Sequence, residues 1–156
     1  MFDQINGLPV HVLVVHAAVV FVPLLALGAI VYALMPRWRS RVGWAVALLA
    51  VVAPLATFAA TESGEKLEGR LLQQGVSGRG AEIIRDHSGY GDLTFYCALA
   101  LGAVALLMVV MTSRGRSLPR VANLGLAVVT VVLGALSGYY VFRTGDSGAT
   151  AVWGTY

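Results

Sequence analysis

The sequence predicts an all-α membrane protein with four transmembrane helices, arranged as two hairpins of the same orientation. The chain of 156 residues is 58% hydrophobic and only 12% charged, whereas charged residues make up about a quarter of an ordinary soluble domain. The charges also gather in short breaks between long uncharged windows. We therefore expect one membrane domain over residues 1–156, with no room for a second, soluble domain.

Four apolar segments are long enough to cross a bilayer, whose hydrocarbon core needs about 20 apolar residues per helix. They cover residues 10–34, 42–60, 93–111 and 121–142. The first segment lacks a basic start and is too long for the apolar part of a cleavable leader, so we expect it to be retained.

Prolines and small residues predict how these helices bend and pack. Pro23 and Pro54 each remove one backbone donor and predict a bend in the first and second helices. Gly134 and Gly138 stand four residues apart in the fourth helix, a spacing that lets helix backbones approach closely. We interpret the pair as packing within the bundle, with a homo-oligomer through small-residue helix faces as the alternative.

The arginines predict the orientation of the chain. The loops 35–41 and 112–120 each hold three arginines and no acidic residue, whereas segment 61–92 holds six acidic and four basic residues. Short arginine-rich loops stay on the cytoplasmic side of a membrane. We therefore expect both loops inside, and both termini and segment 61–92 outside. The net charge of +3 is explained by this asymmetry and does not indicate a nucleic-acid partner.

The outer segment 61–92 has a helical pattern of its own. Leu67, Leu71 and Leu72 share one face of residues 65–74, which predicts a short amphipathic helix at the membrane surface. A glycine-rich break follows at residues 75–80. Residues 81–87 fit either a second short helix or an outward extension of the third membrane helix.

A short echo in the sequence predicts an internal repeat. Residues 61–64 (Thr-Glu-Ser-Gly) end the second membrane helix, and residues 144–148 (Thr-Gly-Asp-Ser-Gly) end the fourth, out of step by one residue. A histidine opens or precedes each inward-going helix. We therefore predict a parallel repeat about an axis along the membrane normal.

The three histidines are the candidate functional residues, because polar titratable groups are rare in membrane helices without a use for them. A helix turns 100° per residue, so His11 and His16 point about 140° apart and do not share one metal ion easily. His16 lies about 7–8 Å deeper at 1.5 Å per residue. We expect His16 to face the bundle interior and His11 to lie nearer the interface.

One imidazole from each hairpin, facing across an apolar gap, suits a haem with two axial ligands. The leading hypothesis is haem b held by His16 and His87, with His11 as the substitute for either, in an electron-transfer protein at the outer face. Expected partners are the lipid bilayer and a redox protein or quinone. The residues expected to support imidazole or propionate are Thr61, Ser63, Asp146, Arg85 and Arg143.

Two other hypotheses stay open. The histidines can hold zinc, copper or iron together with Glu62 or Asp146. Alternatively, the protein is an accessory subunit of a larger membrane complex, and its histidines bind no ligand and only form hydrogen bonds within the bundle. Ser63 and Ser147 each precede a glycine, which favours helix termination over hydrolysis. We therefore do not expect the protein to be a stand-alone enzyme.

Several short motifs, in order along nearly the whole chain, carry a family resemblance. Residues 5–11 (Ile-Asn-Gly-Leu-Pro-Val-His) precede Val15-His16, and residues 63–68 (Ser-Gly-Glu-Lys-Leu-Glu) follow the second helix. Asp86-His87 and Gly91 precede the third helix, and residues 143–149 (Arg-Thr-Gly-Asp-Ser-Gly-Ala) and 151–154 (Ala-Val-Trp-Gly) end the chain. This pattern resembles the DUF2231 family of small bacterial membrane proteins, especially its actinobacterial members.

The resemblance implies a four-helix protein of the bacterial cytoplasmic membrane, and it assigns no function. Some relatives look fused or adjacent to cytochrome-type modules. This analogy, and no mechanism, favours a redox function. Some relatives also carry histidine where this chain has Asp146. That difference removes one possible ligand, so we do not expect a four-histidine site in this chain.

Overall fold

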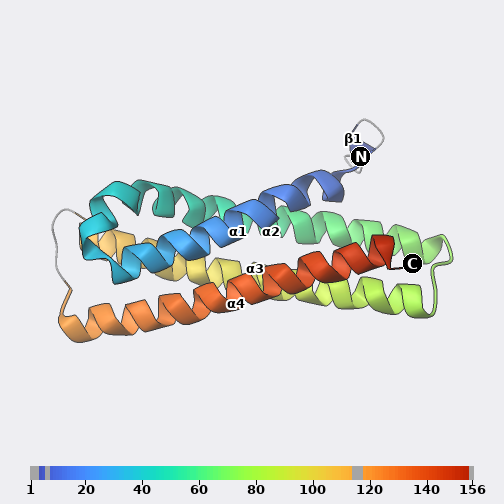
Figure 1. Ribbon diagram of the computed structural model, residues 1–156. Coiled ribbons are helices and arrows are strands. Elements are labelled where there is room, and N and C mark those ends of the chain that lie inside the picture. Colours follow the sequence, from blue (N-terminus) through green and yellow to red (C-terminus); the bar gives the residue numbers. More distant parts are fainter. Residues whose placement is uncertain (1–3, 6–7, 114–117, 155–156) are drawn as a thin grey trace.

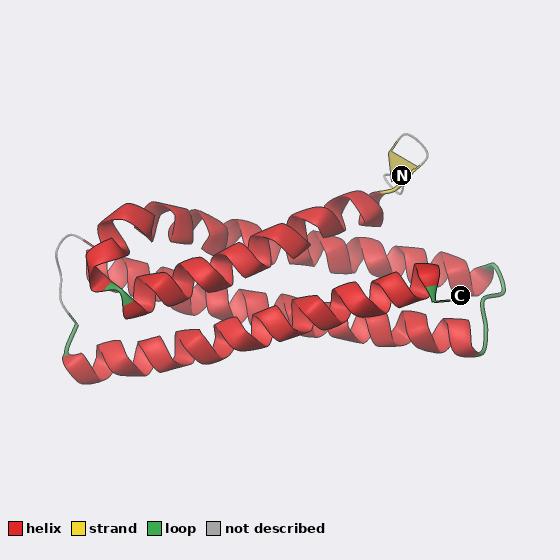
Figure 2. Ribbon diagram, viewed as in Figure 1, coloured by secondary structure: helices red, strands yellow, loops and turns green. Residues whose placement is uncertain are grey.

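The computed structural model describes residues 4–5, 8–113 and 118–154. Within these ranges the chain forms an antiparallel pair of two-residue strands, one 3-10 turn and four long helices (Figures 1 and 2). The elements are β1 (Gln4–Ile5), β2 (Leu8–Pro9), α1 (Val10–Leu34), η1 (Pro36–Trp38), α2 (Arg39–Gln73), α3 (Arg79–Thr112) and α4 (Arg120–Trp153).

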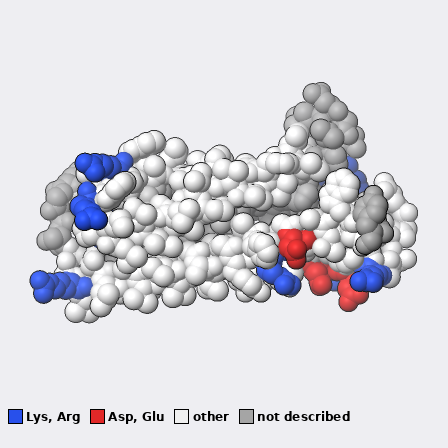
Figure 3. All heavy atoms as spheres, viewed as in Figure 1, with Lys and Arg blue, Asp and Glu red and all other residues white. Residues whose placement is uncertain are grey.

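The all-α prediction with four membrane-spanning helices is confirmed, since each of the four helices is long and apolar enough to cross a bilayer. Helix α1 covers the range predicted for it, and the other three are longer than the predicted apolar spans. They continue past the apolar segments at the end of the bundle that carries the acidic residues (Figure 3).

The outer segment differs from the expected short amphipathic helix over residues 65–74. These residues form the last turns of α2, because no proline interrupts the chain between the apolar span and Gln73. Gly75 and Gly78 then adopt positive φ angles of 94° and 61°, which glycine tolerates without strain, and the chain reverses into α3. Of the two alternatives for residues 81–87, the structure has the extension of the third helix.

The arginine-rich loops lie at one end of the bundle. Arg37, Arg39 and Arg41 stand at the turn between α1 and α2, and Arg120 begins α4. Figure 3 shows basic side chains at both ends of the visible face and acidic side chains at only one. Arg114 and Arg116 of the second predicted loop fall outside the described residues.

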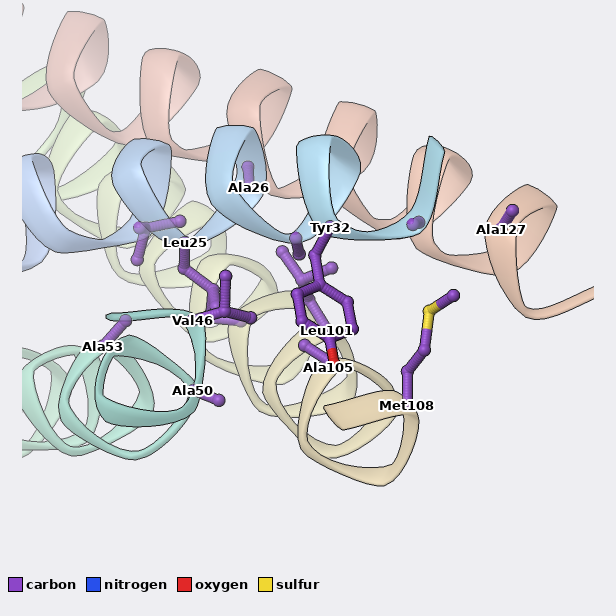
Figure 4. Close-up of a cluster of buried hydrophobic side chains, with 14 residues drawn as sticks. Leu25, Ala26, Tyr32, Val46, Ala50, Ala53, Leu101, Ala105, Met108 and Ala127 are labelled. Carbon is purple, nitrogen blue, oxygen red and sulfur yellow. The ribbon is translucent and has the colours of Figure 1, made fainter. Parts of the chain in front are cut away.

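The helices follow one another around the bundle, so that α1 packs on α2 and α4, α3 packs on the same two helices, and α1 and α3 lie on a diagonal (Figure 1). All four contribute to the buried core in Figure 4, for example through Leu25, Val46, Leu101 and Ala127. Many core residues are alanines, which lets the helices pack closely.

Gly134 takes part in this packing, as interpreted from the sequence. A Cβ atom built on Gly134 would lie 3.0 Å from Ile30 Cδ1 and 3.8 Å from Ala26 Cβ, both on α1. A Cβ atom on Gly138 would meet nothing within 4 Å among the described residues. The two glycines therefore face different surroundings, and the close approach belongs to Gly134.

A polar cluster at the arginine-rich end joins all four helices. Arg39 of α2 donates from Nε to the Tyr32 carbonyl of α1 at 3.0 Å and from Nη2 to Asn123 Oδ1 of α4 at 2.7 Å. Tyr32 Oη lies 2.7 Å from Thr112 Oγ1 of α3. Arg39 thus satisfies a carbonyl at the end of α1 that lacks an intrahelical partner.

Arg39→Ala is expected to destabilise the folded bundle by about 1.5–3 kcal/mol, because a charge-assisted donor to two helices is lost. The measurement is the unfolding transition in mixed detergent micelles. Arg37→Ala is the matched control, since Arg37 is an exposed arginine of the same turn. Equal destabilisation by the two variants would contradict the role of this cluster.

Candidate functional site

His11 lies in the first turns of α1 and is held by α2. Its Nδ1 atom is 3.0 Å from the Ala60 carbonyl and 3.3 Å from Ser63 Oγ. A carbonyl only accepts, so Nδ1 carries the proton and donates it. The Ser63 hydroxyl also donates to the Ala60 carbonyl, at 3.0 Å. The carbonyl therefore fixes the tautomer of His11, and the serine hydroxyl is not activated by an imidazole base.

His87 repeats this arrangement between α3 and α4. Its Nδ1 atom lies 3.0 Å from the Thr144 carbonyl and 3.1 Å from Ser147 Oγ. The Ser147 hydroxyl in turn donates to the Thr144 carbonyl at 3.1 Å. The predicted repeat is therefore present in the contacts. Thr144 corresponds structurally to Ala60, which explains the one-residue offset in the sequence echo.

A glycine follows the serine in each half and lets the imidazole lie against the helix backbone. A Cβ atom on Gly64 would lie 3.2 Å from His11 Cε1, and one on Gly148 would lie 2.9 Å from His87 Cε1. Both distances are shorter than ordinary van der Waals contact between carbon atoms. Each Ser-Gly pair, Ser63-Gly64 and Ser147-Gly148, thus forms a histidine-binding surface that we call a seat. The recurrence of Ser-Gly in the sequence is the signal by which the two seats can be recognised.

Gly148→Ala is expected to push the His87 ring off its seat and to lower bundle stability by about 1–3 kcal/mol, the usual cost of overpacking. Thermal unfolding in micelles measures it. The control is Gly145→Ala, three residues earlier on α4, where a Cβ atom would meet nothing within 4 Å among the described residues. The control is expected to be neutral or stabilising. A loss of stability in both variants would argue against the seat.

The two seated imidazoles face each other across the bundle. Their ring centres are 6.1 Å apart and their planes cross at 86°. They come from α1 and α3, the diagonal pair, so the site lies between the two halves of the repeat. Among the described residues, neither Nε2 atom makes a hydrogen bond. The pair therefore combines two fixed Nδ1–H donors with two Nε2 lone pairs.

The expectation that His16 faces the bundle interior is wrong. His16 is exposed on α1, and its Nδ1 atom lies 2.6 Å from the Val12 carbonyl of the same helix. The rotation of about 140° between the two histidines lets only one of them face α2, and that one is His11. Depth along the helix was the wrong criterion, because rotation decides which side chain enters the bundle.

The other expected site residues divide between the histidine pair and the surface. Ser63 contacts His11, whereas Thr61 donates to the Phe58 carbonyl of its own helix at 2.9 Å. Among the described residues, no group of three or more His, Cys, Asp or Glu side chains is placed to hold a metal ion. The remaining expected partners are exposed: Glu62, Arg85 and Asp146.

Arg143 of α4 lies one turn from the histidine pair and contacts Tyr90 of α3, a residue that the sequence analysis did not single out. Its Nη2 atom donates to Tyr90 Oη at 2.6 Å, and its guanidinium carbon lies 4.7 Å from the Tyr90 ring centre. Nearby, Thr94 Oγ1 lies 2.9 Å from Thr144 Oγ1. The second half of the repeat therefore surrounds its histidine with more polar contacts than the first.

Comparison with known proteins agrees with this architecture. The family model DUF2231, described as a predicted membrane protein, matches residues 7–155. No curated protein and no solved structure gives a significant match. The match covers nearly the whole chain, including both histidines of the facing pair and both Ser-Gly seats. The chain belongs to the DUF2231 family of predicted membrane proteins.

Proposed function

We propose that this protein binds haem b between His11 and His87 and transfers electrons near the outer face of a bacterial cytoplasmic membrane. The observation that carries the proposal is the facing pair itself: two imidazoles on diagonal helices, each fixed through Nδ1 to a backbone carbonyl, with ring centres 6.1 Å apart. His11 takes the role that the sequence assigned to His16.

The tautomer supports metal ligation by both rings. Metal-binding histidines almost always donate their second ring N–H to a carbonyl, a carboxylate or water, which orients the ring and raises its basicity. The Ala60 and Thr144 carbonyls accept this bond here. The Nε2 lone pairs of both rings are therefore the atoms available to a metal ion.

The spacing fits a single ion between the rings. Because bonds from imidazole nitrogen to a metal ion are about 2.0–2.1 Å long, two imidazoles on one ion place their ring centres roughly 6 Å apart. The separation of 6.1 Å between His11 and His87 agrees with this value. The separation of the ring centres is therefore of the size that two imidazoles on one ion require.

The ligand set favours haem over a bare metal ion. Structural zinc is held by four protein ligands, and among the described residues no third His, Cys, Asp or Glu side chain is placed to complete such a site with the pair. Haem brings four equatorial nitrogens of its own and supplies a one-electron iron couple. Two axial histidines leave no open position on the iron, which suits electron transfer to a redox protein or quinone.

The test is an absorption spectrum of the full-length protein purified from haem-replete cells, with iron measured by elemental analysis. We expect a Soret band and the spectrum of six-coordinate, bis-histidine haem, with about one iron per chain. A protein that lacks this absorption and takes up no added haem would contradict the proposal. Stoichiometric zinc or copper in place of iron would replace haem with a non-haem metal.

The proposed orientation has its own test, a cysteine-labelling experiment in a Cys97→Ser background. Gln74→Cys is expected to react with a membrane-impermeant maleimide in spheroplasts, because residue 74 ends the outer extension of α2. Ser40→Cys, at the arginine-rich end, is expected to react only after permeabilisation. The reverse labelling pattern would invert the topology and move the histidine pair to the cytoplasmic face.

A further inference from the structure

The two halves of the repeat carry different residues at the positions one helical turn from the histidine pair, on the side toward the middle of the bundle. Tyr90 follows the histidine of α3 by three residues, and Arg143 precedes the serine of α4 by four. The equivalent positions of α1 and α2 hold Val14 and Ala59. An otherwise symmetric site therefore has a cation and a phenol on one side only.

The donors of Arg143 are not all used. Nη2 donates to Tyr90 Oη at 2.6 Å, and the guanidinium carbon lies 4.7 Å from the Tyr90 ring centre. Nε is buried and makes no hydrogen bond with any described residue. Asp146, one turn further along α4, is exposed and attracts Arg143 electrostatically, but no hydrogen bond joins the two side chains among the described residues. The guanidinium itself thus contacts an aromatic ring and a neutral hydroxyl.

Such a guanidinium calls for an anionic oxygen. Arginine stays protonated in proteins, and a buried N–H without an acceptor is costly. A carboxylate or phosphate that reaches the guanidinium accepts a charge-assisted bond and neutralises the side chain at once. Tyr90 holds Nη2 and so positions the guanidinium for the incoming group.

We propose that Arg143 and Tyr90 form an oxyanion subsite for a carboxylate of the molecule bound between His11 and His87. This inference rests on the haem proposal, in which the carboxylate is a propionate. The facing imidazoles are related by the repeat and cannot distinguish the two faces or the two ends of a planar ligand. The subsite on one side fixes a single orientation.

The experiment compares haem b with its dimethyl ester, in which both propionates are neutral. Each is titrated into the full-length protein in lipid-free neutral detergent. Wild type is expected to bind haem b about 10- to 100-fold more tightly than the ester, the range for hydrogen bonds to a charged group. Arg143→Gln is expected to lose this preference while it keeps the bis-histidine spectrum. Arg143→Lys is expected to retain part of the preference.

Arg79→Gln is the matched control, because Arg79 is an exposed arginine at the start of α3, the helix that carries His87. It is expected to leave the preference unchanged. Equal binding of haem b and the ester by wild type would overturn the subsite and leave the haem proposal standing. Failure of both porphyrins to bind would overturn both. Loss of bound anionic phospholipid in Arg143→Gln, with the porphyrin preference intact, would assign the oxyanion to a lipid phosphate instead.

Discussion

His11→Ala and His87→Ala are each expected to abolish six-coordinate haem binding, whereas His16→Ala should leave the spectrum unchanged. In the proposed haem site, each of the first two variants would remove one of the two imidazole ligands and leave the iron with a single histidine. His16 is exposed on α1, and among the described residues it bonds only to the carbonyl of Val12. The measurement is the absorption spectrum of haem titrated into each purified variant.

The three variants are also controls for one another. All are expected to fold, because each histidine makes no more than two hydrogen bonds, worth about 1 kcal/mol each. Imidazole added to the two alanine variants of the pair should restore the six-coordinate spectrum by occupying the vacated position. Loss of haem in His16→Ala, with normal binding in His11→Ala, would return the site to the pairing that the sequence first suggested.

Gly102→Ala is expected to destabilise the bundle by about 1–3 kcal/mol, in the range found for overpacked cores. A Cβ atom on Gly102 of α3 would lie 2.5 Å from the Ala50 carbonyl oxygen and 3.2 Å from Pro54 Cγ, both on α2. A backbone oxygen cannot rotate away as a flexible side chain does, so the two helices must separate. The gain in helix propensity from glycine to alanine is about 0.5–1 kcal/mol and does not offset this cost.

Denaturant titration of the protein in mixed micelles measures the effect. Gly125→Ala on α4 is the control, because a Cβ atom there would meet nothing within 4 Å among the described residues. We expect the control to be as stable as wild type or slightly more so. A Gly102→Ala protein that unfolds at the wild-type denaturant midpoint would show that α2 and α3 can separate enough to admit the methyl group at little cost in stability.

The sequence predicted the helical spans because their physical cause is local. A hydrocarbon core requires about 20 apolar residues per helix, and that count needs no tertiary information. The range of α1 was predicted in full for this reason. The polar ends of α2 and α3 were not predicted, because residues 61–73 and 79–92 are polar enough for either a surface helix or an extension. Contact between α2 and α3 favours the extension, and Ser88 donates to Glu68 across it.

By itself, the sequence determined the four helices, the positions of the charged segments between the apolar spans, and the recurrence of Ser-Gly after the second and fourth spans. Only the tertiary structure decided that His11 and not His16 faces His87, because pairing depends on how each helix is rotated in the bundle. It also decided that the recurrent glycines seat imidazoles, since a Cβ atom built on Gly148 of α4 would lie only 2.9 Å from Cε1 of His87 on α3. The hydrophobic pattern of one helix does not determine how the neighbouring helices are rotated about their axes.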